Sequence, residues 1–141
     1  MQLDHATEIA TAAHEGQRDR AGNPYILHSL RVMAACPEHP QQVVAILHDV
    51  VEKSRWTLDA LRAEGLPDDL AAALDAVTRR DGEDYFDFVR RAGRNEIARV
   101  VKIADLRDNL TMSRITQSLG ADPAQAEKYR HALQILDAPL D

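Results

Sequence analysis

The chain has 141 residues, a length that suits one domain with a single sizeable core. Hydrophobic residues make up 45% and charged residues 28%, as in ordinary soluble proteins, and the net charge of −6 disfavours a general nucleic-acid binder, which would more often be basic. The N-terminal residues do not resemble a signal peptide, and no apolar run approaches the roughly 20 residues of a membrane span. The single cysteine, Cys36, permits no internal disulfide, as is usual in a reducing compartment. We therefore expect a cytoplasmic protein with neither a membrane nor a nucleic-acid partner.

Helical periodicity continues along nearly the whole chain, and no segment alternates apolar and polar residues as a strand does. Glycine and proline interrupt this pattern often, and the interruptions predict about seven to nine helices with short connections, which is an all-α helical bundle. Thr57 is a favourable N-cap for one of the shorter helices. The expected helices cover about 3–15, 25–33, 41–53, 58–64, 67–79, 85–92, 95–110 and 124–136.

The segment 95–110 is apolar around most of its circumference, so we expect it to form a central helix. The segment 44–50 is a second apolar run. The residues expected in the core are Val44, Leu47, Val50, Val100, Val101 and Ala104.

A His-Asp pair stands in the middle of the apolar run 44–52, with a glutamate one turn after the histidine. Burial of an ionised carboxylate is costly unless a charge partner, hydrogen bonds or a metal ion compensates for it. On its own, the pair is equally well explained as a satisfied polar pair that caps or bridges helices. Two further residues favour a metal site: His28 at the start of an apolar helix, and Asp105 within the apolar segment 100–106. Together with His48 and Asp49 they form a ligand set suited to Mn²⁺, Fe²⁺, Co²⁺ or Zn²⁺.

The helix predicted over 41–53 carries two charged residues close to the His-Asp pair. His48 and Glu52 are four residues apart and would share a helix face, so Glu52 can accept the proton of a water that a metal ion activates. The alternative for Glu52 is an exposed charge at a helix end. Lys53 stands four residues after Asp49, and its simplest interpretation is a solvated pair with that aspartate.

The helices that carry His28 and Asp105 have further polar residues on the same faces. Lys102, Asp105 and Asn109 follow an i, i+3, i+7 spacing, although Asn109 is equally well explained as a surface amide. His28 and Arg31 lie one turn apart and can face the same region. Three helices can therefore aim these residues and the His-Asp pair at one point.

Five motifs follow one another in order along the chain: Ala13–Gln17, Gly22–His28, Ile46–Glu52, Thr78–Arg80 and Val101–Asn109. With these motifs the chain resembles the HD-domain metal-dependent phosphohydrolases, and within them the guanosine polyphosphate (ppGpp) pyrophosphohydrolases of RelA/SpoT and small Mesh1 type. The similarity extends over about residues 5–112, and the ordered set is specific although each piece alone is weak.

The resemblance implies a fold, a cofactor and an activity. The implied fold is a single all-α HD domain over residues 1–141, and the implied cofactor is one Mn²⁺ ion. The implied activity is removal of the 3′-pyrophosphate from ppGpp, which leaves GDP and pyrophosphate. RelA/SpoT proteins carry a synthetase domain after the HD domain, and 141 residues leave no room for one, so a hydrolase-only protein is implied.

The resemblance also assigns roles to individual residues. The positions that match metal ligands are His28, His48, Asp49 and Asp105, and the catalytic positions are Glu52, which is associated with activation of the water, and Asp49. Arg20 matches a basic residue in the loop that contacts substrate, and Lys102 and Asn109 match positions near the metal and the nucleotide. With Lys53, whose charge is favourable near a polyphosphate, these are the expected substrate contacts. The expected partner is a guanine nucleotide or a related small phosphorylated substrate, and the chain is a candidate for a homodimer.

Two departures from the family pattern bear on the substrate. Lys53 replaces the second acid of the family's Glu-Asp pair, and Asp19 stands between Arg18 and Arg20 where the family often has a further cation. A lysine near a polyphosphate is favourable, whereas a carboxylate there is not. Two other functions therefore stay open: an HD phosphohydrolase for another nucleotide, such as a nucleoside monophosphate, and a nucleotide-binding module without catalysis.

Overall fold

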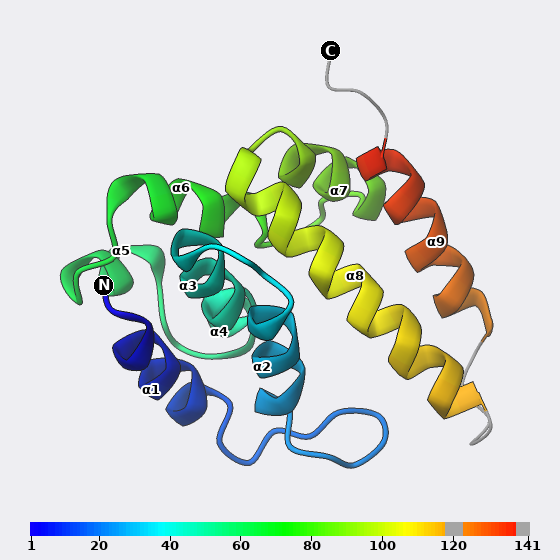
Figure 1. The fold of residues 1–141 in the computed structure, drawn as a ribbon, viewed down its shortest axis with the longest axis horizontal. Coiled ribbons are helices and arrows are strands. Elements are labelled where there is room, and N and C mark those ends of the chain that lie inside the picture. The colour runs from blue at the N-terminus through cyan, green and yellow to red at the C-terminus, as the bar shows by residue number, and fades with distance from the viewer. Residues whose placement is uncertain (118–122, 138–141) are drawn as a thin grey trace.

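The computed structural model describes residues 1–117 and 123–137, and within these ranges the protein is a bundle of nine helices without a sheet (Figure 1). The predicted all-α fold is confirmed. The only pairing of extended backbone in the described part of the chain is an isolated bridge between Arg18 and Pro24. The helices are α1 (Leu3–Ala13), α2 (Ile26–Ala34), α3 (His39–Leu47), α4 (Val50–Lys53), α5 (Leu58–Ala63), α6 (Asp68–Ala76), α7 (Tyr85–Gly93), α8 (Glu96–Gln117) and α9 (Pro123–Asp137).

Helix α8 is the central element, as its apolar circumference predicts. It packs against α2, α3, α6, α7 and α9, and in Figure 1 it crosses the molecule between α9 on one side and α2 with α3 on the other. The main core lies between α1, α2, α3, α6 and α8, and a smaller apolar cluster joins α7, α8 and α9. Of the residues expected in the core, Val100 is partly buried and packs against the core, and the others are buried: Val44, Leu47, Val50, Val101 and Ala104.

The helix boundaries follow local chemistry at several places. The predicted N-cap of α5 is confirmed, because the Thr57 hydroxyl accepts a hydrogen bond from the Ala60 amide at 3.1 Å. Gly65 follows this helix with a φ of 104°, a conformation that residues with a side chain rarely adopt. The amino group of Met1 donates to the Gly65 carbonyl, so the start of the chain lies against this turn.

The prediction of one continuous helix over 41–53 is wrong, because the structure has a turn at His48 and Asp49 between α3 and α4. The Ala45 carbonyl accepts a short hydrogen bond of 2.6 Å from His48 Nδ1 and also one from the His48 amide at 3.3 Å. Regular bonding resumes where the Lys53 amide donates to the Asp49 carbonyl at 3.0 Å. The His48 side chain thus occupies the Ala45 carbonyl, which in a continuous α-helix would accept a hydrogen bond from the Asp49 amide.

This architecture brings together three segments that are far apart in the sequence. Helix α2 packs against both α3 and α8, and α3 also packs against α8. The start of α2, the turn after α3 and the middle of α8 therefore come together, and in Figure 1 the connection that joins α1 to α2 runs below the start of α2. None of the described helices is long and apolar enough to cross a membrane.

Candidate metal centre

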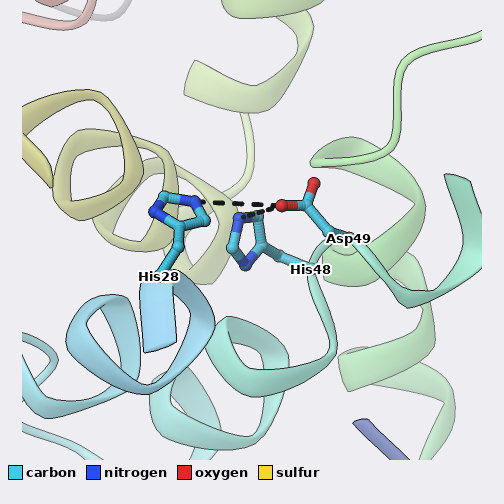
Figure 2. A group of neighbouring side chains, drawn as sticks. All are labelled: His28, His48 and Asp49. Atoms are coloured by element: carbon cyan, nitrogen blue, oxygen red, sulfur yellow. Dashed lines mark ion pairs between the residues drawn. The ribbon is translucent and has the colours of Figure 1, made fainter. Parts of the chain in front are cut away.

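Four acidic and imidazole side chains converge where these segments meet. The Nε2 atom of His48 lies 3.0 Å from Asp49 Oδ2 and 3.3 Å from Asp105 Oδ1. The Nε2 atom of His28 lies 2.9 Å from the same Asp105 oxygen and 3.8 Å from Asp49 Oδ2. Figure 2 shows both rings and the Asp49 carboxylate pointing toward one another, and His28, His48 and Asp49 form a group that can hold a metal ion.

The hydrogen bonds of His48 fit a bound cation. Its Nδ1 is engaged by the Ala45 carbonyl, so this nitrogen carries the proton and the lone pair of a neutral ring belongs to Nε2. This Nε2 is buried and has no hydrogen-bond partner in the described part of the chain, yet two carboxylate oxygens stand close to it. Lone pairs facing one another repel unless a positive charge lies between them. The donor set therefore suits a divalent metal.

Without a metal, a proton is the cation that the site can hold. Burial alone would lower the pKa of His48, but Asp49 and Asp105 outweigh it and raise this pKa well above its usual value. Burial opposes ionisation of Asp49, and the neighbouring His48 outweighs it, so the pKa of Asp49 is lowered. Burial likewise opposes ionisation of Asp105, but Lys102 and the two histidines outweigh it and lower its pKa. Both carboxylates are therefore ionised at neutral pH and available as ligands.

A second group of side chains holds the carboxylates in place. The Tyr25 hydroxyl donates to Asp49 Oδ2 at 2.6 Å. Lys102 Nζ donates to Asp105 Oδ2 at 2.9 Å, and Asn109 Nδ2 donates to Asp105 Oδ1 at 3.2 Å. Lys102 is buried, and its ammonium also lies 4.6 Å from the centroid of the Phe88 ring. Lys102, Asp105 and Asn109 thus lie on one face of α8, as their i, i+3, i+7 spacing predicts, and both Lys102 and Asn109 bind the Asp105 carboxylate.

Tyr25 and Asp108 lie within two of the motifs, but neither is among the predicted site residues. Asp108 Oδ2 lies 2.6 Å from His28 Nδ1, and both Asp108 oxygens accept hydrogen bonds from Arg31, at 2.7 and 3.1 Å. The available signal was its spacing, since Asp108 follows Asp105 by three residues and therefore lies on the same face of α8. Tyr25 stands three residues before His28, so the same spacing applies to it.

A cavity of about 370 Å³ opens beside the centre. Four cations, Arg18, Arg20, Arg31 and Lys53, line it together with the acids Asp19 and Asp108. Its wall also includes His28 and Asn109, and Tyr129 from α9, far along the chain. Three of the predicted substrate-contact residues, Arg20, Lys53 and Asn109, thus face this cavity, whereas Lys102 lies behind Asp105 and does not line it.

The turn that contains His48 and Asp49 separates α3 from α4, which carries the charged residues Glu52 and Lys53. Glu52 is exposed and does not line the cavity, although its neighbour Lys53 does. Lys53 makes no ion pair with Asp49 in the described structure, and its ammonium lies 4.9 Å from the centroid of the Tyr25 ring. The interpretation of Lys53 as a solvated partner of Asp49 is therefore not supported by this geometry.

Comparisons with known proteins relate the chain to a defined group, although no protein-family model matches it. It is 32% identical to a probable GTP pyrophosphokinase of Mycobacterium leprae, with 98% of this chain and 18% of that protein aligned. It is 35% identical to a guanosine-3′,5′-bis(diphosphate) 3′-pyrophosphohydrolase of Haemophilus influenzae, over 52% of this chain and 11% of that protein. The chain thus spans less than a fifth of the length of these relatives.

A solved structure has the same fold. It is that of a metazoan orthologue of SpoT that hydrolyses ppGpp, and it superimposes with a TM-score of 0.72 over 95% of this chain and 82% of the other. The sequence identity in this superposition is 21%, so the likeness concerns the arrangement of the helices.

Proposed function

Because the chain belongs to the family of RelA/SpoT ppGpp hydrolase domains, we propose that it is a metal-dependent pyrophosphohydrolase that removes the 3′-pyrophosphate from ppGpp. One observation carries the proposal: the buried Nε2 of His48, which has no hydrogen-bond partner among the described residues, faces two carboxylates beside a cavity lined by four cations. A centre suited to a divalent metal and a pocket suited to phosphate groups are the two parts that such a hydrolase needs.

The proposed ligands are His28, His48, Asp49 and Asp105, and the proposed ion is one Mn²⁺. When bound, such an ion polarises a phosphate oxygen and lowers the pKa of water. The surrounding side chains restrain the ligands. The Tyr25 hydroxyl binds one Asp49 oxygen, and the Lys102 ammonium and the Asn109 side-chain amide bind Asp105.

We assign the remaining roles to residues that line the cavity or stand beside it. Arg20 and Lys53 neutralise the substrate phosphates, and Asn109 lies between the cavity and Asp105. Tyr129 offers an aromatic face on which a nucleobase can stack. Glu52 is the proposed acceptor of the proton from the attacking water, a role taken from the family pattern.

A second candidate function is hydrolysis of a different nucleotide. It is favoured by Asp19, which lines the cavity among the cations. The negative charge of Asp19 would repel a phosphate group bound next to it, so a substrate with fewer phosphates would fit better there. A nucleotide-binding module without catalysis is the third candidate function.

We propose that residues 1–141 act as one HD domain. The homodimer stays a prediction.

The decisive experiment incubates the Mn²⁺-loaded protein with ppGpp, GTP, GDP and GMP and separates the products by chromatography. The proposal expects GDP and pyrophosphate from ppGpp and little change in the other nucleotides. Release of phosphate from GMP instead would favour the second function. Tight binding of ppGpp without hydrolysis of any nucleotide would favour the binding module.

A further inference from the structure

Two basic residues of α2 bind two acidic residues of α8, and each pair has i, i+3 spacing in its own helix. Helix α2 presents His28 and Arg31, and α8 presents Asp105 and Asp108. His28 bridges both acids, with Nε2 at 2.9 Å from Asp105 and Nδ1 at 2.6 Å from Asp108. Arg31 closes the arrangement by donating from Nε and Nη2 to the two oxygens of Asp108. The proposed metal ligands form one half of this arrangement, and the other half is unassigned.

The Asp108 carboxylate lies in a sheltered place. Its side chain is 12% exposed, and that of His28 is 6% exposed. Arg31 donates to both Asp108 oxygens, which holds the carboxylate against His28. A buried carboxylate next to Nδ1 makes that nitrogen the donor, which leaves the lone pair of a neutral imidazole on Nε2. It also restrains rotation of the ring about the Cβ–Cγ bond.

We propose that Asp108, held by Arg31, is a positioning residue of the metal centre: it sets the tautomer and orientation of His28 so that Nε2 faces Asp49 and Asp105. The inference rests on the proposed metal-dependent function. It deepens that function, because it gives His28 the same arrangement that the Ala45 carbonyl gives His48. The two histidines are thus oriented by different means, one by a backbone carbonyl and one by a charged pair.

A purely structural role is the competing explanation. The Arg31–Asp108 pair connects α2 to α8, and loss of such a connection would lower stability with or without a metal ion. A positioning role predicts in addition a change in metal affinity, because a misoriented or wrongly protonated His28 is a poor ligand. The two explanations therefore differ in the affinity of the folded protein for the ion.

The test measures the dissociation constant of Mn²⁺ at pH 7.5 by competition with a fluorescent chelator. We expect Asp108→Ala to weaken Mn²⁺ binding by about 10–100-fold, the usual effect of removing such an outer partner. Asp108→Asn keeps an acceptor without its charge and should lose less. Arg31→Met should also weaken binding, but it should have no further effect in the Asp108→Ala background, since its influence on His28 passes through Asp108.

Asp87 and Arg90 provide controls of the same residue types, because they form an exposed ion pair within α7, 3.1 Å apart, away from the metal centre. Asp87→Ala and Arg90→Met should leave Mn²⁺ affinity unchanged. Thermal unfolding of each metal-free variant gives its stability separately. Wild-type affinity in Asp108→Ala, whatever its melting temperature, would overturn the inference and leave the proposed function standing. Wild-type protein that binds no divalent ion would overturn both.

Discussion

The two proposed imidazole ligands each have one ring nitrogen engaged by the protein itself. Nδ1 of His48 bonds a backbone carbonyl, and Nδ1 of His28 lies against the Asp108 carboxylate. This leaves both Nε2 atoms facing Asp49 and Asp105. At the scale of single residues, the centre is therefore arranged to hold positive charge before any ligand binds.

The first prediction concerns the carboxylates. Asp49→Ala and Asp105→Ala should each abolish stoichiometric Mn²⁺ binding and any hydrolytic activity, because each substitution removes a charged oxygen from the centre. Elemental analysis after gel filtration measures the metal content, with Asp87→Ala as a control that should retain it. A full complement of metal in both site variants would contradict the ligand assignment.

Glu52 is the residue whose proposed role the geometry supports least, since it is exposed and outside the cavity lining. If it accepts the proton of the attacking water, Glu52→Gln should reduce kcat by about 10²–10⁴-fold and leave Mn²⁺ affinity nearly unchanged. Steady-state kinetics and chelator competition separate the two effects. An unchanged kcat would remove Glu52 from the mechanism.

Lys53 gives a separate prediction, because it faces the cavity from the position next to Glu52. Lys53→Ala should raise KM for ppGpp with little change in kcat if its ammonium contributes uniform binding of a phosphate group. Lys53→Asp, which restores the acid of the family pattern, should shift the preference among nucleotides. Equal KM values for wild type and Lys53→Ala would exclude the phosphate contact.

At the scale of elements, the connection between α6 and α7 is held by one arginine away from the metal centre. Arg91 donates to the carbonyls of Asp75 and Thr78, at 2.9 and 2.8 Å, and to both oxygens of Glu83. Hydrogen bonds from Arg91 lower the pKa of Glu83 from 4.5 to about 2. The ionised form of Glu83 thus stabilises the folded protein.

Glu83→Gln should therefore reduce the free energy of unfolding by about 1.5–3 kcal/mol at pH 7, the range for hydrogen bonds to charged groups. The contribution of Glu83 is complete above its unfolded pKa and is lost as the pH falls from 4.5 toward 2, so the two proteins should converge in that window. Urea unfolding monitored by circular dichroism at several pH values measures the difference. Asp75→Asn, which removes an exposed ion pair with Arg80, serves as a control with a smaller expected effect. A difference that stays constant from pH 7 to pH 3 would rule out this charge effect.

At the scale of the whole molecule, the proposed centre joins helices from three parts of the sequence: α2, the turn after α3, and α8. An ion that binds only the folded state stabilises it by mass action, about 2.7 kcal/mol when its concentration is 100 times the dissociation constant. Mn²⁺ at that excess should raise the melting temperature by roughly 5–15 °C, and a chelator should reverse the change.

Differential scanning calorimetry with and without Mn²⁺ measures this shift. The matched comparison is Asp105→Ala, which should show no shift because the ligand from α8 is missing. An equal rise in both proteins would indicate that Mn²⁺ stabilises the fold from another place.

The sequence by itself determined the helical class and the residue types of the centre. Periodicity is a local property, and it located the apolar run around His48 and Asp49 and the central helix that carries Asp105. It did not predict the break between α3 and α4, because the His48 side chain takes the carbonyl that a helix would use. The partners Tyr25 and Asp108, and the cavity that Tyr129 helps to enclose, were decided by the tertiary structure alone. The His28–Asp108 contact joins residues 80 positions apart through the packing of α2 against α8, the Tyr25–Asp49 contact joins the start of α2 to the turn after α3, and Tyr129 reaches the cavity from α9. Local periodicity carries no information about how these helices pack against one another.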